Sequence, residues 1–173
     1  MKKIIIIIFI IFTFIVAGNI GEAKVIIPDE AIRIRIVPNS NSIIDQNIKT
    51  KVKTNLQNDM YDIVKNTHNI NKARQLINNN LNKIDKNINN ILIKENYKLG
   101  YKINFGYNYF PAKEFRGVTY NEGYYESVVV TIGQGNGNNW WCVMFPPLCL
   151  MEAEENENIK YASFVQEIIS KYK

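Results

Sequence analysis

The stretch Ile32-Arg33-Ile34-Arg35-Ile36 alternates strictly between apolar and basic residues, and this pattern is the starting point for the fold. Successive side chains of a β-strand point to opposite faces of a sheet, so the alternation predicts a strand with one buried face. Pro38 ends the predicted strand, and the Asn and Ser residues at 39–42 are typical of a turn. Ser42, with Asp45 three residues later, predicts the N-cap of a helix that follows the turn.

Two amphipathic helices are predicted after this turn, separated by a polar break at residues 67–69. In both helices apolar residues return every three or four positions and therefore form one stripe along each helix. We expect the stripes to cover the sheet, and a seam for a partner helix is the alternative. The stripe residues are Ile44, Ile48, Val52, Leu56, Met60 and Val64 in the first helix, and Ile70, Ala73, Ile77, Leu81, Ile84, Ile88 and Ile91 in the second.

Further strands are predicted in the second half of the chain. Residues 101–107 alternate apolar with polar side chains, residues 124–132 are rich in Tyr and Val, and residues 140–145 read Trp-Trp-Cys-Val-Met-Phe. The last two segments are joined by the Gly- and Asn-rich residues 133–139, so we expect them to form an antiparallel hairpin. A short amphipathic helix ends the chain. The prediction is an α+β fold: a mainly antiparallel sheet of about four strands, a two-helix insertion after the first strand and a C-terminal helix.

The first 23 residues have the pattern of an export signal. Lys2 and Lys3 precede an apolar run at residues 4–16, and Gly21-Glu22-Ala23 provides the small residues of a cleavage site after Ala23. This apolar run is short for a membrane span, which needs about 20 residues, and an uncleaved N-terminal anchor is the alternative. The predicted organisation is a signal peptide (1–23), a single α+β domain (24–151), and an acidic linker with the C-terminal helix (152–173).

Composition and charge exclude several functions. The 173 residues, 46% of them hydrophobic, suit one folded domain rather than a disordered chain. The net charge of +5 is spread along the chain, so we expect no binding to nucleic acid. His68 is the single histidine, which excludes a three-histidine zinc site. The Gly133-x-Gly135-x-Gly137 spacing precedes a predicted strand, whereas a dinucleotide site needs a helix there. No cofactor, metal or small-molecule substrate is expected.

Cys142 and Cys149 are the two cysteines of the chain, and in an exported protein they are expected to form a disulfide. The alternative is a catalytic thiol at Cys142 that is paired with His68, although His68 lies in a polar helix break. Three glutamates between residues 114 and 126 have no spacing that places two carboxylates in a cleft. We therefore predict no catalytic residues.

Apolar residues crowd the two cysteines, where a turn would be polar. Adjacent residues of a strand point to opposite faces, so Trp140 and Trp141 cannot share one core face. One of them can lie in the core, while the other faces outward or covers a second layer. Exposed Trp and Pro-rich surface is typical of partner sites, and burial of the whole segment is the alternative. The predicted partner-binding residues are Trp140, Trp141, Phe145, Pro146, Pro147 and Leu148.

Residues 139–149, Asn-Trp-Trp-Cys-Val-Met-Phe-Pro-Pro-Leu-Cys, closely resemble the N-W-W-C-V-L-F-P-P-L-C signature of the stage II sporulation protein R family. A second stretch resembles that family's R-x-x-x-N-S-D-S-x-x-D-Q-x-x-K-x-K-V, with Asn41 in place of the usual Asp. The resemblance runs from about Ile32 to Met151. The matching residues of the second stretch include Arg35, Asn39, Ser40, Asp45, Gln46, Lys49 and Lys51.

The resemblance implies a signal rather than an enzyme. Members of this family are secreted by the forespore into the space between forespore and mother cell. There they trigger a membrane-embedded aspartic protease of the mother cell, which processes an inactive sigma-factor precursor. That protease is therefore the expected partner. The rival functions are an exported cell-wall-associated hydrolase that uses Cys142 or a carboxylate, and a structural coat or septum protein.

Overall fold

The computed structural model describes residues 25–26, 30–115, 118–148 and 158–171. The predicted signal peptide, the acidic linker at residues 152–157 and Cys149 lie outside these ranges, so the predicted domain boundaries stay predictions. Within the described ranges, no helix combines the length and the apolar character that crossing a bilayer requires.

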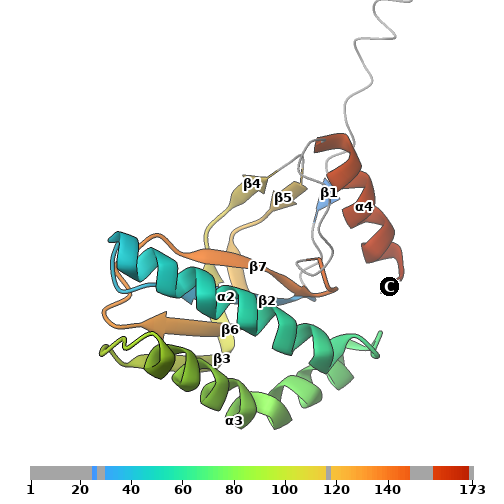
Figure 1. Ribbon diagram of the computed structural model, residues 1–173. Coiled ribbons are helices and arrows are strands. Elements are labelled where there is room, and N and C mark those ends of the chain that lie inside the picture. Colours follow the sequence, from blue (N-terminus) through green and yellow to red (C-terminus); the bar gives the residue numbers. More distant parts are fainter. Residues whose placement is uncertain (1–24, 27–29, 116–117, 149–157, 172–173) are drawn as a thin grey trace, which may run out of the picture.

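A mixed sheet of four strands forms the centre of the molecule, in the order β3-β6-β2-β7 (Figure 1). β3 (Tyr101–Phe110) pairs with β6 (Gly123–Ile132) in antiparallel orientation. β2 (Ile32–Val37) is parallel to β6 and antiparallel to β7 (Trp140–Phe145). The α+β class and a mostly antiparallel sheet are thus confirmed, with a parallel pair at the centre of this sheet.

The predicted hairpin between residues 124–132 and 140–145 is wrong, because β2 lies between β6 and β7. β2 is apolar on one face, and every buried backbone N–H and C=O on its two edges needs a hydrogen-bond partner. Insertion between the two later strands provides partners on both edges. The segment at residues 133–139 therefore crosses the end of β2 instead of closing a tight turn.

Two long helices, α2 (Ile43–Val64) and α3 (Ile70–Lys94), cover one face of this sheet (Figure 1). Ser42 caps α2, as predicted, because its side chain accepts a hydrogen bond from the backbone amide of Asp45. Asn69 caps α3 in the same way. A side chain that satisfies an otherwise unpaired amide fixes where each helix begins.

The apolar stripes of the two helices pack on the sheet and form the main core, so the prediction that they cover it is confirmed. Ile44 is the exception, since it is 67% exposed. The face of the sheet that they cover carries the isoleucines of β2, whereas Arg33 and Arg35 lie on the opposite face. The buried residues of the main core include Ile32, Ile34, Ile36, Val52, Leu56, Ile77, Ile84, Val128 and Val130.

A smaller second layer lies on the side of the sheet away from α2 and α3. The sequence indicated such a layer only as one of two possibilities for the second tryptophan, and the strands of this layer were not predicted. β1 (Val25–Ile26), β5 (Val118–Tyr120) and β4 (Lys113–Phe115) form a small sheet near α4 (Asn158–Lys171), which is the predicted C-terminal helix (Figure 1). Along the chain, β4 and β5 lie between β3 and β6. The buried apolar residues between this layer and the main sheet are Ala31, Val118, Tyr120, Val143, Leu148, Val165, Ile168 and Ile169.

Candidate functional site

At the carboxyl end of β2, the loop that leads into the motif stretch at residues 139–149 packs on the turn of the other motif stretch. Backbone amides of the loop at residues 134–138 donate four hydrogen bonds to the turn at residues 38–41, with N···O distances of 2.6 to 3.0 Å. Two of these bonds go to the side-chain oxygens of Asn39 and Asn41. Asn41 therefore has a contact of its own although it replaces the usual Asp. We call residues 38–49 together with residues 133–138 the motif junction.

Glycine is required where this loop approaches the turn most closely. A Cβ on Gly137 would collide with the backbone carbonyl of Ser40. Gly133 has a φ of +58°, in the left-handed region, and a Cβ there would lie 2.5 Å from the side-chain oxygen of Asn39. The glycines at 133 and 137 are therefore explained by the packing of this loop on the turn.

Replacing Gly137 by Ala is expected to lower the free energy of unfolding by about 1–3 kcal/mol, the usual cost of an overpacked site. The matched control is Gly100→Ala, because a Cβ on Gly100 meets nothing within 4 Å. The urea midpoint should fall for the Gly137 variant and stay near the wild-type value for the Gly100 variant. Equal midpoints for the two variants would show that the loop does not rest on Ser40.

Asp45 is the buried anion of the motif junction, with 6% of its surface exposed. It accepts hydrogen bonds from the hydroxyls of Ser40 and Tyr97, each at 2.5 Å, and from the side-chain amide of Asn39 at 3.0 Å. The hydrogen bonds from Ser40 and then Tyr97 are the main reasons that the pKa of Asp45 is lowered to about 2. Burial and the bond to Asp45 raise the pKa of the Tyr97 phenol. Asp45 thus ties α2, the turn and the segment after α3 together.

The neighbouring motif residues extend this network. The Gln46 side chain donates to the carbonyl oxygen of Ser40 at 3.0 Å and accepts from the Lys49 ammonium at 2.5 Å. Lys49 also donates to the backbone carbonyl of Asn138 at 3.0 Å, so it joins α2 to the loop. Lys51 instead pairs with Glu95 beyond the end of α3, at 2.5 Å. The polar motif residues on α2 therefore bind other parts of the same chain.

The two arginines of β2 lie on the opposite face of the sheet. Arg33 is fully buried, and its guanidinium carbon is 3.3 Å from the ring centroid of Tyr125 and 5.4 Å from that of Trp141. Arg35 donates to the backbone carbonyl of Tyr109 at 3.2 Å and stacks on Phe110. Aromatic faces attract a guanidinium, so these contacts join the main sheet to the second layer.

Trp140 and Trp141 point to opposite faces, as predicted, and both are partly buried. Trp140 packs against the main core, with the Lys53 ammonium 5.2 Å from its ring centroid. Trp141 packs against the second layer, with edge-to-face contacts to Phe110 at 5.4 Å and Tyr120 at 5.2 Å. The second tryptophan therefore covers a second layer rather than facing solvent.

The expectation that residues 145–148 form an exposed apolar surface is corrected, because all four are buried. Phe145 and Leu148 are 3% and 2% exposed, and Pro146 and Pro147 lie between them. The physical reason is the second layer, whose strands were not predicted from the sequence and which provides an apolar partner for this segment. The burial corrects the expected exposure alone, and a partner contact by any of the six predicted residues stays a prediction.

Cys142 and His68, the pair of the alternative thiol enzyme, lie on different elements of the fold. Cys142 lies in β7, on the face that packs against the main core, and its sulfur lies 3.7 Å from the carbonyl oxygen of Val143. His68 is exposed in the connection between α2 and α3. Cys149 is outside the described residues, so the disulfide stays a prediction. Within the described residues, no three His, Cys, Asp or Glu side chains are grouped as metal ligands.

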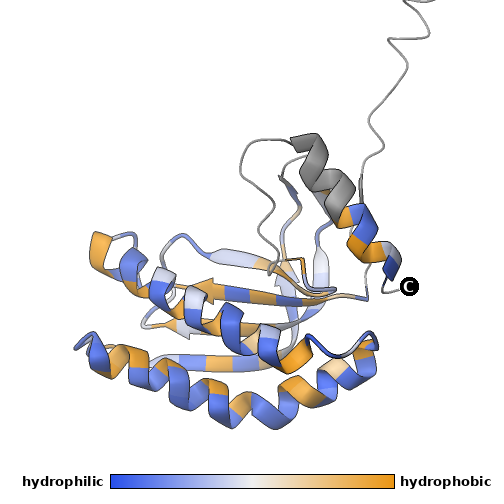
Figure 2. Ribbon diagram, turned by 45° about the vertical axis from the view of Figure 1, so that its right-hand side comes forward, coloured by the Kyte–Doolittle hydropathy of each residue, from blue (hydrophilic) through white to orange (hydrophobic). Residues whose placement is uncertain are grey.

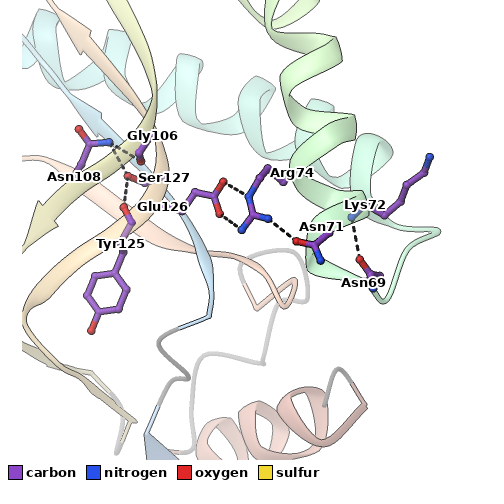
Figure 3. Close-up of polar contacts among 9 residues, drawn as sticks. All are labelled: Asn69, Asn71, Lys72, Arg74, Gly106, Asn108, Tyr125, Glu126 and Ser127. Carbon is purple, nitrogen blue, oxygen red and sulfur yellow. Dashed lines mark hydrogen bonds and ion pairs between the residues drawn. The ribbon is translucent and has the colours of Figure 1, made fainter.

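Glu126, one of the glutamates near the later strands, is buried and forms an ion pair with the partly exposed Arg74, which was not predicted from the sequence. Its carboxylate oxygens accept from Nε and Nη2 of Arg74 at 2.6 and 2.7 Å, and Arg74 also donates to Asn71 at 2.6 Å (Figure 3). The hydrogen bond to Glu126 raises the pKa of Arg74. Figure 3 shows the Glu126 carboxylate directed at α3. The hydroxyl of the neighbouring Ser127 accepts a hydrogen bond from the side-chain amide of Asn108. A two-point pair of this kind fixes α3 on β6.

Comparison with known proteins agrees with the sequence motifs. Residues 28–155 match the family model described as stage II sporulation protein R. Stage II sporulation protein R of Bacillus subtilis (strain 168) is 34% identical over 171 residues, a match that covers 92% of this chain and 76% of the relative. No solved structure matches the chain significantly.

Proposed function

The chain belongs to the stage II sporulation protein R family, a family of sporulation proteins, and we propose that it acts as a secreted signal of endospore formation. In this proposal the forespore exports the chain into the space between forespore and mother cell. There the chain activates a membrane-embedded aspartic protease of the mother cell, which processes an inactive sigma-factor precursor. The observation that carries the proposal is the family match over residues 28–155, which includes both motif stretches.

The geometry of the motif junction supports a signalling role. Asp45, Gln46 and Lys49 form hydrogen bonds within the junction itself, and Asp45 is buried. Residues that bind one another in this way set the shape of a surface, whereas catalytic residues must reach a substrate. The motifs are therefore best explained as the scaffold of a protein that is recognised by its shape.

Three exposed tyrosines provide the surface that we propose for the contact with the protease. Tyr107 and Tyr124 are each 72% exposed and Tyr109 is 47% exposed. The rings of Tyr109 and Tyr124 meet edge to face, 5.7 Å apart, and Tyr109 donates to Glu122 at 3.0 Å. Tyrosine is enriched among residues that dominate binding energy, and the pairing of β3 with β6 holds these rings in place.

Replacing Tyr107 and Tyr124 together by Ser is expected to reduce precursor processing at least tenfold, because truncation at a true contact costs about 2 kcal/mol or more. The matched control is Tyr61→Ser, since Tyr61 is 45% exposed on α2, outside this surface. Both variants should be exported at the wild-type level, as measured by immunoblot. Wild-type processing by the Tyr107/Tyr124 variant would place the contact elsewhere.

We also propose that Cys142 and Cys149 form a disulfide, which would stabilise the fold by about 2–3 kcal/mol on the chain-entropy model. In support, no cysteine of the described residues is a free thiol. Both cysteines should resist alkylation in the exported protein until it is reduced.

Substitutions of the same two cysteines distinguish the proposed signalling function from that of the rival hydrolase. If the chain is a signal, Cys142→Ser and Cys149→Ser should lower secretion or stability to a similar extent. If Cys142 is a nucleophile, Cys142→Ser alone should abolish activity in an otherwise stable protein. Precursor processing per molecule of exported protein distinguishes the two results.

The proposal is tested in an endospore-forming host whose own copy of this gene is deleted. Precursor processing should be lost in the deletion strain and restored by the full chain. The chain without residues 1–23 should fail to restore it although the protein accumulates in the forespore. Restoration by that shortened chain would contradict a role outside the forespore.

A further inference from the structure

Four large aliphatic side chains are exposed at the end of the molecule where α2 begins and α3 ends. Ile43 and Ile44 are 81% and 67% exposed, Ile93 is 67% exposed and Leu99 is 43% exposed. The hydrogen bond from Tyr97 to Asp45 and the ion pair between Lys51 and Glu95 hold the two helix ends together. Figure 2 shows the apolar first turn of α2 at the end of the molecule far from α4. We call residues 43–44 with residues 93–99 the aliphatic end.

Ile43, Ile44 and Ile93 keep most of their surface uncovered by the other described residues. A hollow of about 530 Å³ opens beside Ile44, between the first turns of α2 and the segment after α3, and Tyr97 lines its other side. An isolated exposed isoleucine needs no explanation, but several large aliphatic side chains at one end of a molecule mark an interaction site.

The charge around the aliphatic end is positive. Residues 41–51 and 90–102 contain five lysines and two acidic residues. Both acids are already engaged, since Asp45 is buried among hydrogen-bond donors and Glu95 is paired with Lys51. Lys94 and Lys98 are exposed beside Ile93 and Leu99. An approaching surface of negative charge would therefore be attracted to this end.

We propose that the aliphatic end docks on the surface of an anionic lipid bilayer. The isoleucines and the leucine enter the headgroup region, and the lysines lie among the lipid phosphates with their aliphatic stems along the apolar side chains. Aliphatic residues with lysine fit a lipid surface better than a protein, because protein contacts are enriched in Trp, Tyr and Arg and depleted in Lys. This binding goes beyond the proposed function, since it concerns lipid rather than the protease.

Vesicle co-sedimentation of the exported full-length protein tests the proposal. The probes are vesicles of phosphatidylcholine alone and vesicles that also contain phosphatidylglycerol. We expect binding to the anionic vesicles that weakens as salt is added, because each lysine near such a surface strengthens binding about fivefold. Ile43→Ser/Ile44→Ser should weaken this binding at least tenfold, and Lys94→Glu/Lys98→Glu should do the same.

The matched control is Tyr107→Ser/Tyr124→Ser, which replaces two side chains that are similarly exposed but lie on β3 and β6. This variant should bind anionic vesicles like the wild type while it fails to cause processing, so the failure of one proposal is distinct from the failure of the other. Absent binding to anionic vesicles, or equal binding by the wild type and the isoleucine variant, would overturn the lipid proposal. Loss of processing by the isoleucine variant with unchanged vesicle binding would also overturn it, because the aliphatic end would then contact a protein.

Discussion

Replacing Asp45 by Asn is expected to lower the free energy of unfolding at pH 7 by about 2–3 kcal/mol. The pKa of Asp45 is about 2 in the folded protein, against about 3.9 for an unfolded Asp, and one pKa unit corresponds to about 1.4 kcal/mol. The variant loses the negative charge that accepts hydrogen bonds from the hydroxyls of Ser40 and Tyr97. Its side-chain amide hydrogens would also face groups that are themselves hydrogen-bond donors. The urea unfolding midpoint measures this loss.

The pH dependence of the difference in unfolding free energy between the wild type and Asp45→Asn shows whether the charge of Asp45 causes that difference. A carboxyl group whose pKa is depressed by folding contributes stability that is complete above its unfolded pKa and is lost as the pH falls through its folded pKa. The wild type and the Asp45→Asn variant should therefore converge between about pH 4 and pH 2. Asp62→Asn on the same helix is the control, because its carboxylate is exposed and should leave the midpoint unchanged. A difference in unfolding free energy that does not change with pH would show that Asp45 is not held as an anion.

Replacing Trp141 by Ala is expected to lower the free energy of unfolding by about 3 kcal/mol, a typical cost for removing a large aromatic side chain from a core. Trp141 contacts Phe110, Tyr120 and the Arg33 guanidinium, so its loss separates the second layer from the main sheet. Hydrogen exchange should therefore accelerate in β5 while the middle of α2 stays protected. Secretion should fall together with stability.

The control for this prediction is Trp140→Ala, which removes a ring from the other face of β7. In this variant exchange should accelerate in α2 rather than in β5. If the Trp141 variant is as stable as the wild type but no longer causes processing, its ring is a partner contact and does not hold the second layer. Such a result would restore the interpretation of this tryptophan that was drawn from the sequence alone.

Local elements were predictable because the cause of each lies within a few residues. The alternation at residues 32–36 and the Ser42 cap gave β2 and the start of α2. Ile44 was misjudged as core because periodicity assigns a side chain to a helix face but does not say how far the sheet extends beneath that face.

Strand order was not predictable, because nothing at residues 133–139 distinguishes a tight turn from a loop that crosses the end of a third strand. Only the structure shows that Asn39 and Asn41 bind this loop. The short strands β4 and β5 lie beside a Pro and a Gly, where local patterns are weakest, so the strands of the second layer were not predicted. The burial of residues 145–148 was not predicted for the same reason, because the elements that cover this apolar segment were not recognised in the sequence.

The most direct test of the account is the length of the sigma-factor precursor in non-sporulating cells that produce the precursor, the mother-cell protease and this chain. The account predicts a shortened precursor when all three are present and the chain keeps residues 1–23. It predicts an intact precursor when the chain is omitted, when residues 1–23 are removed or when the catalytic aspartate of the protease is replaced. A precursor that stays intact beside exported, folded chain and active protease, or one that is shortened equally without the chain, would contradict the account.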